Sequence, residues 1–235
     1  MEQKSFNFEI FLYPSLLILT LWVVYWGEFY APIDIVSLGI MPRTLEGLSG
    51  VFFSPLIHST NDIYHLINNS IPVFVLSVAL LFYYRKVAFQ VFFLSWFLSG
   101  ILTWIIAKNE GSFHIGISSV IYSLVCFLFL SGILKRQKHL QAVSLLIVFL
   151  YGSLVWGIFP MEEKISWQGH LGGSITGIVL AAYYYDGPTQ PNKNSEKTEL
   201  KTEDKTQEQL NVLSKQYRNN SSSGIHYNYI ITKED

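Results

Sequence analysis

The chain has 235 residues, of which half are apolar and only 14% carry a charge, against about 25% in an ordinary soluble domain. Of its 16 basic and 17 acidic residues, 15 lie in the last 50 positions, so the first 185 residues are far too apolar for a soluble domain. A net charge of −1 without a basic stripe argues against a nucleic-acid partner, and the single cysteine, Cys126, excludes an internal disulfide and a cysteine-based zinc site.

Six stretches are long and apolar enough to be read as membrane-spanning helices, which need about 20 mostly apolar residues each. The first of them lacks a basic leader and a small-residue cleavage site, so we expect it to stay in the mature protein. The sequence therefore predicts an all-α membrane protein whose domain 1–185 is a six-helix bundle. The expected spans are 10–30, 64–84, 87–107, 115–134, 140–159 and 169–185.

The short connections between these stretches predict the orientation of the bundle. With six spans, the N-terminus, the turns near residues 85 and 136, and the tail share one side of the membrane. The N-terminus and loops of that side carry six lysine and arginine residues, whereas the other side carries three despite a longer loop. The positive-inside rule therefore predicts that both termini are cytoplasmic. We expect an integral multi-pass membrane protein, and its expected location is a bacterial cytoplasmic (inner) membrane.

The tail, residues 186–235, differs in character from the rest of the chain. It is densely charged with both signs and has few apolar residues, so it cannot bury enough surface to fold alone. We expect a cytoplasmic, largely disordered segment, with a short helix possible around 203–217. The sequence does not indicate a role for it.

Polar side chains gather near one end of three spans, where the bilayer makes them costly and therefore candidates for function. On the second span, His65 and Asn69 are spaced i, i+4 and share a helix face. On the fourth, Ser118 lies in the first turn, and on the sixth, His170 stands at the start. All three spans begin on the predicted outer side, so we expect one outer cavity to contain these groups.

Ser118 and His170 suit acyl transfer, because a serine hydroxyl is a weak nucleophile until a base takes its proton. The only acidic residue within the six spans is Glu28, so we expect a Ser–His dyad rather than a triad. Tyr122, one turn below the serine, is expected to pack on the imidazole and orient it. The side chains of His65 and Asn69 and the backbone N–H of Ser118 are candidate oxyanion donors.

Simpler structural roles stay open for each of these residues taken alone. A histidine at a helix start can be an interfacial residue, and a Ser-Ser pair can bond back to a carbonyl one turn earlier. The glycines of the sixth span can form a helix-packing face without any chemistry. The convergence of a nucleophile, a base and two donors at one depth favours function.

Three motifs resemble the rhomboid family of intramembrane serine proteases. GISSVIYSL (116–124) is similar to the nucleophile segment of the family, HLINN (65–69) to its HxxxN pattern, and GHLGGSITG (169–177) to its GHxxGxxxG pattern. The stretch 42–59 also resembles a rhomboid first loop. The resemblance spans about residues 40–185 and implies the basic six-helix form of the fold.

The resemblance implies a role for each motif residue. It makes Ser118 the nucleophile, His170 the general base and His65 and Asn69 the oxyanion stabilisers, with Gly116 and Tyr122 in support. Both the Gly-x-Ser and the Ser-x-x-x-Tyr spacings select Ser118 over Ser119, which stands where the family usually has glycine. No metal or other cofactor is implied.

The expected function is cleavage of membrane-anchored proteins near the outer end of their transmembrane helix, at a site with helix-breaking residues, since most peptide bonds of such a helix are shielded. The partners would be transmembrane substrates and membrane lipid. The resemblance suggests lateral access between the second and fifth spans, with Trp156 and Phe159 as candidate gate residues. Substrate identity, cleavage sequence and oligomeric state are not encoded in any motif.

Three alternatives stay open at this stage. A catalytically inactive rhomboid-like protein that binds transmembrane helices would share the fold, and Ser119 is its main support. A metal-dependent membrane protein using His58, His65 and His170 is weaker, because the chain has no HExxH motif and no carboxylate ligand in these spans. A transporter is weaker still, because the chain shows no inverted repeat.

Overall fold

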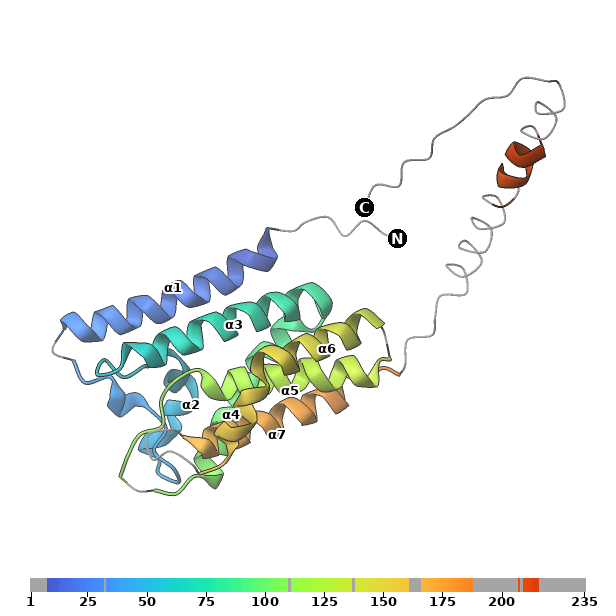
Figure 1. Ribbon diagram of the computed structural model, residues 1–235. Coiled ribbons are helices and arrows are strands. Elements are labelled where there is room, and N and C mark those ends of the chain that lie inside the picture. Colours follow the sequence, from blue (N-terminus) through green and yellow to red (C-terminus); the bar gives the residue numbers. More distant parts are fainter. Residues whose placement is uncertain are drawn as a thin grey trace. The chain divides into compact units, whose positions relative to one another are not determined.

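The computed structural model describes residues 8–31, 33–109, 111–136, 138–160, 166–187, 207 and 209–215. The chain divides into two compact units, Met1–Pro188 and Thr189–Asp235. In the second unit, residues 209–215 are helical. In the first, the described residues form a bundle of long helices (Figure 1): α1 (Glu9–Tyr30), α3 (Ile63–Tyr83), α4 (Ala88–Ile106), α5 (Ser118–Leu134), α6 (Lys138–Tyr151) and α7 (Trp167–Tyr183).

These helices match the apolar stretches of the sequence closely, and the all-α prediction is confirmed. Among the described residues, α1, α3 and α4 are long and apolar enough to cross a membrane, whereas α5 and α6 are shorter apolar helices. The count of six spans therefore stays a prediction.

The fifth predicted span differs from the structure in its second half. The α-helical part, α6, ends at Tyr151, and the chain continues as a 3-10 helix, η4 (Gly152–Ile158), instead of an α-helix up to residue 159. Gly152 stands at the changeover, where the lack of a side chain weakens helix preference. The tighter winding and the early end leave backbone carbonyls of η4 available to partners outside the helix.

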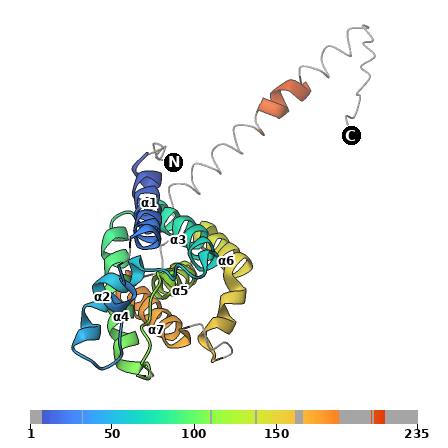
Figure 2. The same ribbon diagram turned by 90° about the vertical axis from the view of Figure 1, so that its left-hand side faces the viewer.

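Helix α5 lies in the middle of the bundle, where it contacts α3, α4, α6 and α7 (Figure 2), and α1 packs mainly on α3. Its apolar side chains Val120, Leu124 and Phe127 are fully buried. These contacts make α5 the element against which the other helices are positioned.

Helix α7 approaches α5 and α4 closely because glycines stand at the points of contact on its buried face. A Cβ at Gly173 would overlap the Ser119 carbonyl of α5, and a Cβ at Gly177 would overlap the Ser123 carbonyl. On the α4 side, a Cβ at Gly172 would stand 3.2 Å from the Leu102 Cβ. Small residues are what allow membrane helices to pack at this distance.

Helices α4 and α5 are joined by hydrogen bonds between serines. Ser123 donates to Ser95 at 2.8 Å, and Ser99 donates to Ser119 at 3.2 Å. The two serines of α4 are four residues apart, and so are the two serines of α5. Each helix therefore makes both bonds from one face. In an apolar environment such pairs satisfy polar groups and hold the helices in register.

The segment between α1 and α3 folds into short helices: η1 (Val36–Leu38), η2 (Glu46–Leu48), α2 (Gly50–Phe53) and η3 (Ser54–Leu56). Two tryptophans of α4 hold this segment: Trp96 donates to the Phe52 carbonyl at 3.0 Å, and Trp104 donates to the Thr44 carbonyl at 2.9 Å. The segment therefore leads to α3 in a defined position.

Candidate active site

Ser118 is the first residue of α5, and the turn before it is built around Gly116. That glycine has φ +102°, in the left-handed region that other residues rarely adopt, and its N–H donates to the Ser54 carbonyl at 2.8 Å. A Cβ there would also stand 3.1 Å from the His65 ring. The backbone thus requires glycine two residues before Ser118, both for its dihedral angles and for space.

His170 lies in the first turns of α7, whose start is anchored by Ser166. The Ser166 hydroxyl accepts from the Gly169 N–H at 3.2 Å and lies 2.6 Å from Nδ1 of His114, in the segment before α5. The capping residue therefore connects the two chain segments that carry Ser118 and His170.

The imidazole of His170 is buried and makes two hydrogen bonds, one through each nitrogen. Its Nε2 lies 2.9 Å from the Ser118 Oγ, and its Nδ1 lies 2.9 Å from the Gly157 carbonyl oxygen in η4. A carbonyl only accepts, so Nδ1 carries the proton and Nε2 presents a lone pair. In this tautomer the Ser118 hydroxyl donates to Nε2, which is the arrangement of a nucleophile and its base.

Tyr122 stacks on the other side of this imidazole. The two ring centroids are 4.1 Å apart and the planes are 10° from parallel. Because Tyr122 is one turn below Ser118 on α5, the same helix carries the hydroxyl and the surface on which its partner rests. A Cβ at Gly157 would overlap the Tyr122 hydroxyl and stand 3.1 Å from Nδ1, so residue 157 is also confined to glycine.

Asn69 and His58 form a buried pair beside this turn. The Asn69 Nδ2 lies 3.2 Å from the His58 Nε2, and the His58 side chain is fully buried. Burial lowers the pKa of His58 to about 3 and His65 adds to the effect, while the Leu56 backbone acts in the opposite direction. A neutral His58 accepts one N–H of the amide, which leaves the second N–H of Asn69 for another acceptor.

His65 and Asn69 lie over the same short segment of backbone. The His65 ring packs edge-on against His58, with centroids 5.2 Å apart, and both His65 and Asn69 come within 4 Å of the Cβ position at Gly116. The two side chains from α3, which share one helix face, therefore both lie beside the turn that leads into Ser118.

The two adjacent serines of α5 face different partners. Ser118 contacts His170, whereas the Ser119 hydroxyl accepts from Ser99 on α4. The Ser119 hydroxymethyl group is therefore accommodated by a serine on the neighbouring helix.

The remaining sequence candidates lie as follows. Trp156 and Phe159 are exposed, with ring centroids 6.3 Å apart, after the end of α6. Within the described ranges, no three His, Cys, Asp or Glu side chains are arranged to hold a metal ion. His58, named in the sequence only as a possible metal ligand, instead pairs with Asn69.

Sequence reasoning missed two partners of the site. Gly157 acts through its backbone carbonyl, which leaves no residue-specific pattern along the chain. His58 stands seven residues before His65. Its position just upstream of the HxxxN pair was the signal that could have identified it as a partner of the site.

A comparison with known protein families identifies the family of this chain. The model of the Rhomboid domain matches residues 45–187, which include every residue of the site described above. The chain belongs to the rhomboid family. It is therefore a rhomboid-family membrane protein, and its match begins within the segment between α1 and α3 and ends just after α7.

Relatives of this chain occur in mycobacteria. The uncharacterized protein Rv1337 of Mycobacterium tuberculosis is 35% identical over 158 residues, which are 64% of each chain. The uncharacterized protein ML1171 of Mycobacterium leprae is 31% identical over 162 residues, 66% of this chain and 63% of its own. The chain thus spans just under two thirds of the length of these relatives, whose names state no activity.

Proposed function

We propose that this rhomboid-family protein is an intramembrane serine endopeptidase that cleaves membrane-anchored proteins near the outer end of their transmembrane helix. The observation that carries the proposal is the 2.9 Å contact between Ser118 Oγ and His170 Nε2, with the opposite nitrogen bonded to the Gly157 carbonyl. Such a pair combines a nucleophile with a base whose tautomer is already set.

In the proposed reaction, Ser118 Oγ attacks the carbonyl carbon of the scissile bond while its proton moves to His170 Nε2. The imidazolium is stabilised by the Gly157 carbonyl and by stacking on Tyr122. It then returns the proton to the leaving amine as the C–N bond breaks. Water attacks the acyl-enzyme in the second half, again giving a proton to Nε2, and Ser118 leaves with that proton.

The negative charge on the carbonyl oxygen requires hydrogen-bond donors fixed in advance. The proposed donors are His65, the second N–H of Asn69 and the first backbone N–H groups of α5. The first N–H groups of a helix have no carbonyl partner within the helix and can therefore donate to a ligand. The proximity of His65 and Asn69 to the turn at Gly116 supports this assignment.

The proposed substrate is a membrane protein whose helix is unwound by helix-breaking residues, because an intact helix shields its peptide bonds. The dyad lies where α5 and α7 begin, which the loop charges assign to the outer face, with both termini cytoplasmic. Access from the side, past the exposed Trp156 and Phe159, completes the proposal.

The deciding experiment labels the purified full-length protein in detergent with a fluorophosphonate probe and locates the adduct by mass spectrometry. Ser118→Ala and His170→Ala are expected to abolish labelling and cleavage of a fluorescent transmembrane substrate. Ser119→Ala, the matched control on the adjacent residue, is expected to keep both.

An adduct on Ser119, or wild-type cleavage by Ser118→Ala, would refute the assignment. A protein that binds the transmembrane substrate but is neither labelled nor active would instead be an inactive rhomboid-like binder.

A further inference from the structure

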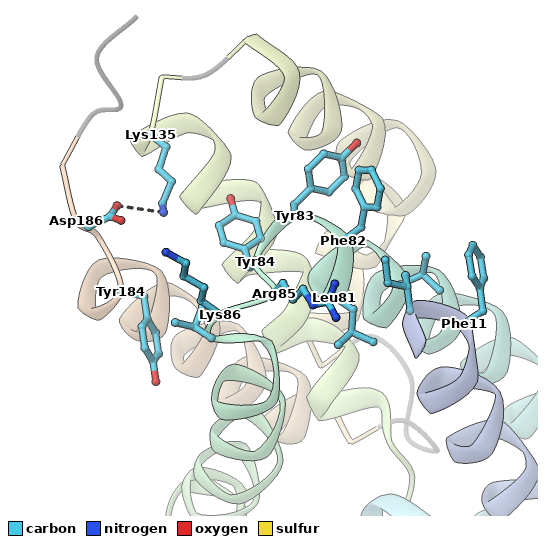
Figure 3. Close-up of a pocket in the computed structure, with 13 residues that line it drawn as sticks. Phe11, Leu81, Phe82, Tyr83, Tyr84, Arg85, Lys86, Lys135, Tyr184 and Asp186 are labelled. Carbon is cyan, nitrogen blue, oxygen red and sulfur yellow. Dashed lines mark ion pairs between the residues drawn. The ribbon is translucent and has the colours of Figure 1, made fainter. Parts of the chain in front are cut away.

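A concave site lies at the end of the bundle opposite Ser118. It has a volume of about 500 Å³ and is formed where α3 and α5 end, where α1 and α4 begin and where the chain leaves α7 (Figure 3). The side chains most relevant to its chemistry are Phe11, Leu81, Phe82, Lys86, Lys135 and Asp186. None of them belongs to the candidate active site.

Positive charge exceeds negative charge in this pocket. Arg85, Lys86 and Lys135 line it together with the carboxylate of Asp186. Arg85 is itself paired with the Glu9 carboxylate at 3.0 Å, so the two lysines face Asp186 alone. The Lys135 Nζ lies 3.0 Å from Asp186 Oδ1, and Figure 3 shows the Lys86 ammonium also directed toward this region. The hydrogen bond from Lys135, with a smaller contribution from Lys86, lowers the pKa of the Asp186 carboxyl, so the residue is ionised at neutral pH.

The Lys135–Asp186 pair is readily exchanged for another anion. The Asp186 side chain is 75% exposed, and an ion pair with one partner in water contributes little to stability. Lys135 itself is held in place, because its ammonium lies 5.5 Å from the centre of the Tyr84 ring and only 19% of its side chain is exposed. A fixed cation with a loosely bound partner is suited to an incoming phosphate.

The other walls of the pocket are apolar. Leu81 and Phe82 come from the last turn of α3, and Phe11 comes from the first turn of α1. The cations follow directly after the apolar helices α3 and α5, so the pocket lies at the depth where a membrane-spanning bundle meets the lipid headgroups. Lysine and arginine beside an apolar surface at this depth match an anionic, amphiphilic ligand better than a soluble one.

We propose that this pocket binds the phosphate of an anionic phospholipid, with Lys86 and Lys135 as its ligands in place of Asp186 and with an acyl chain along Phe11 and Phe82. The occupant is a lipid of the leaflet next to this end of the bundle. The proposal requires that the bundle spans a membrane, but it does not depend on protease activity, so the two proposals fail separately.

The test measures lipid retained by the purified full-length protein, by native mass spectrometry in detergent, with phosphatidylglycerol or phosphatidylcholine added. Wild type is expected to retain phosphatidylglycerol preferentially. The double variant Lys86→Gln/Lys135→Gln is expected to bind it about 25-fold more weakly, about five-fold for each lysine, the factor equivalent to about 1 kcal/mol per cation near an anionic surface.

The matched control is Arg136→Gln/Lys138→Gln, which removes the same charge from the same end of the bundle but at residues that do not line the pocket. It is expected to keep binding within about three-fold, because a cation outside the pocket contributes only through the screened surface field. Asp186→Asn removes the competing carboxylate and is expected to bind phosphatidylglycerol several-fold more tightly.

Equal losses in the two double variants would show general surface attraction and overturn the proposal, as would equal retention of the two lipids by wild type. Displacement of phosphatidylglycerol by millimolar inorganic phosphate, with no lipid preference left in phosphate-free buffer, would identify a soluble-anion site instead. Unchanged unfolding temperatures of the variants establish that lost binding is not lost folding.

Discussion

The imidazole of His170 is held by the backbone of Gly157, whose carbonyl oxygen lies 2.9 Å from Nδ1. In a serine triad a carboxylate occupies this position, orients the ring and selects its tautomer. Here a main-chain oxygen at the end of a 3-10 helix provides the orientation, and Tyr122 supports the ring face. The arrangement depends on where residue 157 lies and not on an ionisable side chain.

Gly157→Ala tests this dependence. The added methyl would overlap the Tyr122 hydroxyl and crowd Nδ1 of His170, so we expect at least about a 100-fold loss in the rate of probe labelling, the usual cost of about 1 Å of misplacement. Gly27→Ala, where the new Cβ meets nothing within 4 Å, is the control and should label like wild type. If Gly157→Ala is labelled at the wild-type rate, the position of the Gly157 carbonyl is not needed to orient His170.

The stacking of Tyr122 on His170 predicts a difference between two substitutions. Tyr122→Phe keeps the aromatic face and should keep activity within about three-fold, whereas Tyr122→Leu loses the stacking and should lose up to about ten-fold, the value of an aromatic pair. Cleavage rates of the fluorescent transmembrane substrate measure both. Equal rates for Phe and Leu would show that the ring only fills space.

Asn69 is expected to act on the transition state and not on substrate binding. Asn69→Ala removes one oxyanion donor and should lower kcat by about 10²–10³-fold with little change in KM. Asn68→Ala provides the control, because its exposed side chain lies on a different face of α3. Steady-state kinetics of the two variants decide, and a loss confined to KM would contradict the assignment.

His58 predicts how stability depends on pH. Its pKa is lowered to about 3 in the folded protein, against an ordinary value of 6.5, so the unfolded chain takes up the proton first as the pH falls. Protonation of residue 58 therefore does not reduce the free energy of unfolding above about pH 6.5. Below that pH the free energy of unfolding decreases progressively toward pH 3. Thermal unfolding in detergent at pH 7 and pH 4.5 should show a smaller acid-induced decrease for His58→Gln than for wild type.

The exposed His139 on α6 supplies the control for that experiment. His139→Gln should keep the wild-type decrease between the two pH values. If His58→Gln also keeps it, another group causes the acid sensitivity.

Close packing of α7 on α5 predicts a stability effect away from the dyad. Gly177→Ala would overlap the Ser123 carbonyl and stand 2.8 Å from the Cys126 Cβ, so overpacking should cost about 1–3 kcal/mol and lower the unfolding temperature. Gly172→Ala, whose new Cβ meets Leu102 at 3.2 Å, should have the smaller effect of the two. The opposite order in thermal unfolding would contradict this packing.

Local features of the site were visible along the chain. The spacing of His65 and Asn69 places both on one helix face, and the pattern of glycines after His170 indicates a close helix contact. The fifth apolar stretch was less informative, because hydropathy does not distinguish an α-helix from the 3-10 helix that follows Tyr151. The carbonyl that η4 presents to His170 was therefore not predicted.

By itself, the sequence determined the all-helical membrane class and the rhomboid motifs, because apolar length and residue spacing are properties of one helix at a time. Only the tertiary structure decided that Ser118 meets His170 while Ser119 meets Ser99, and that Gly157 and His58 complete the surroundings. These contacts join segments far apart in the chain. Their geometry depends on how closely the glycines let the helices approach one another. The distance between two packed helices cannot be read from the sequence pattern of either helix.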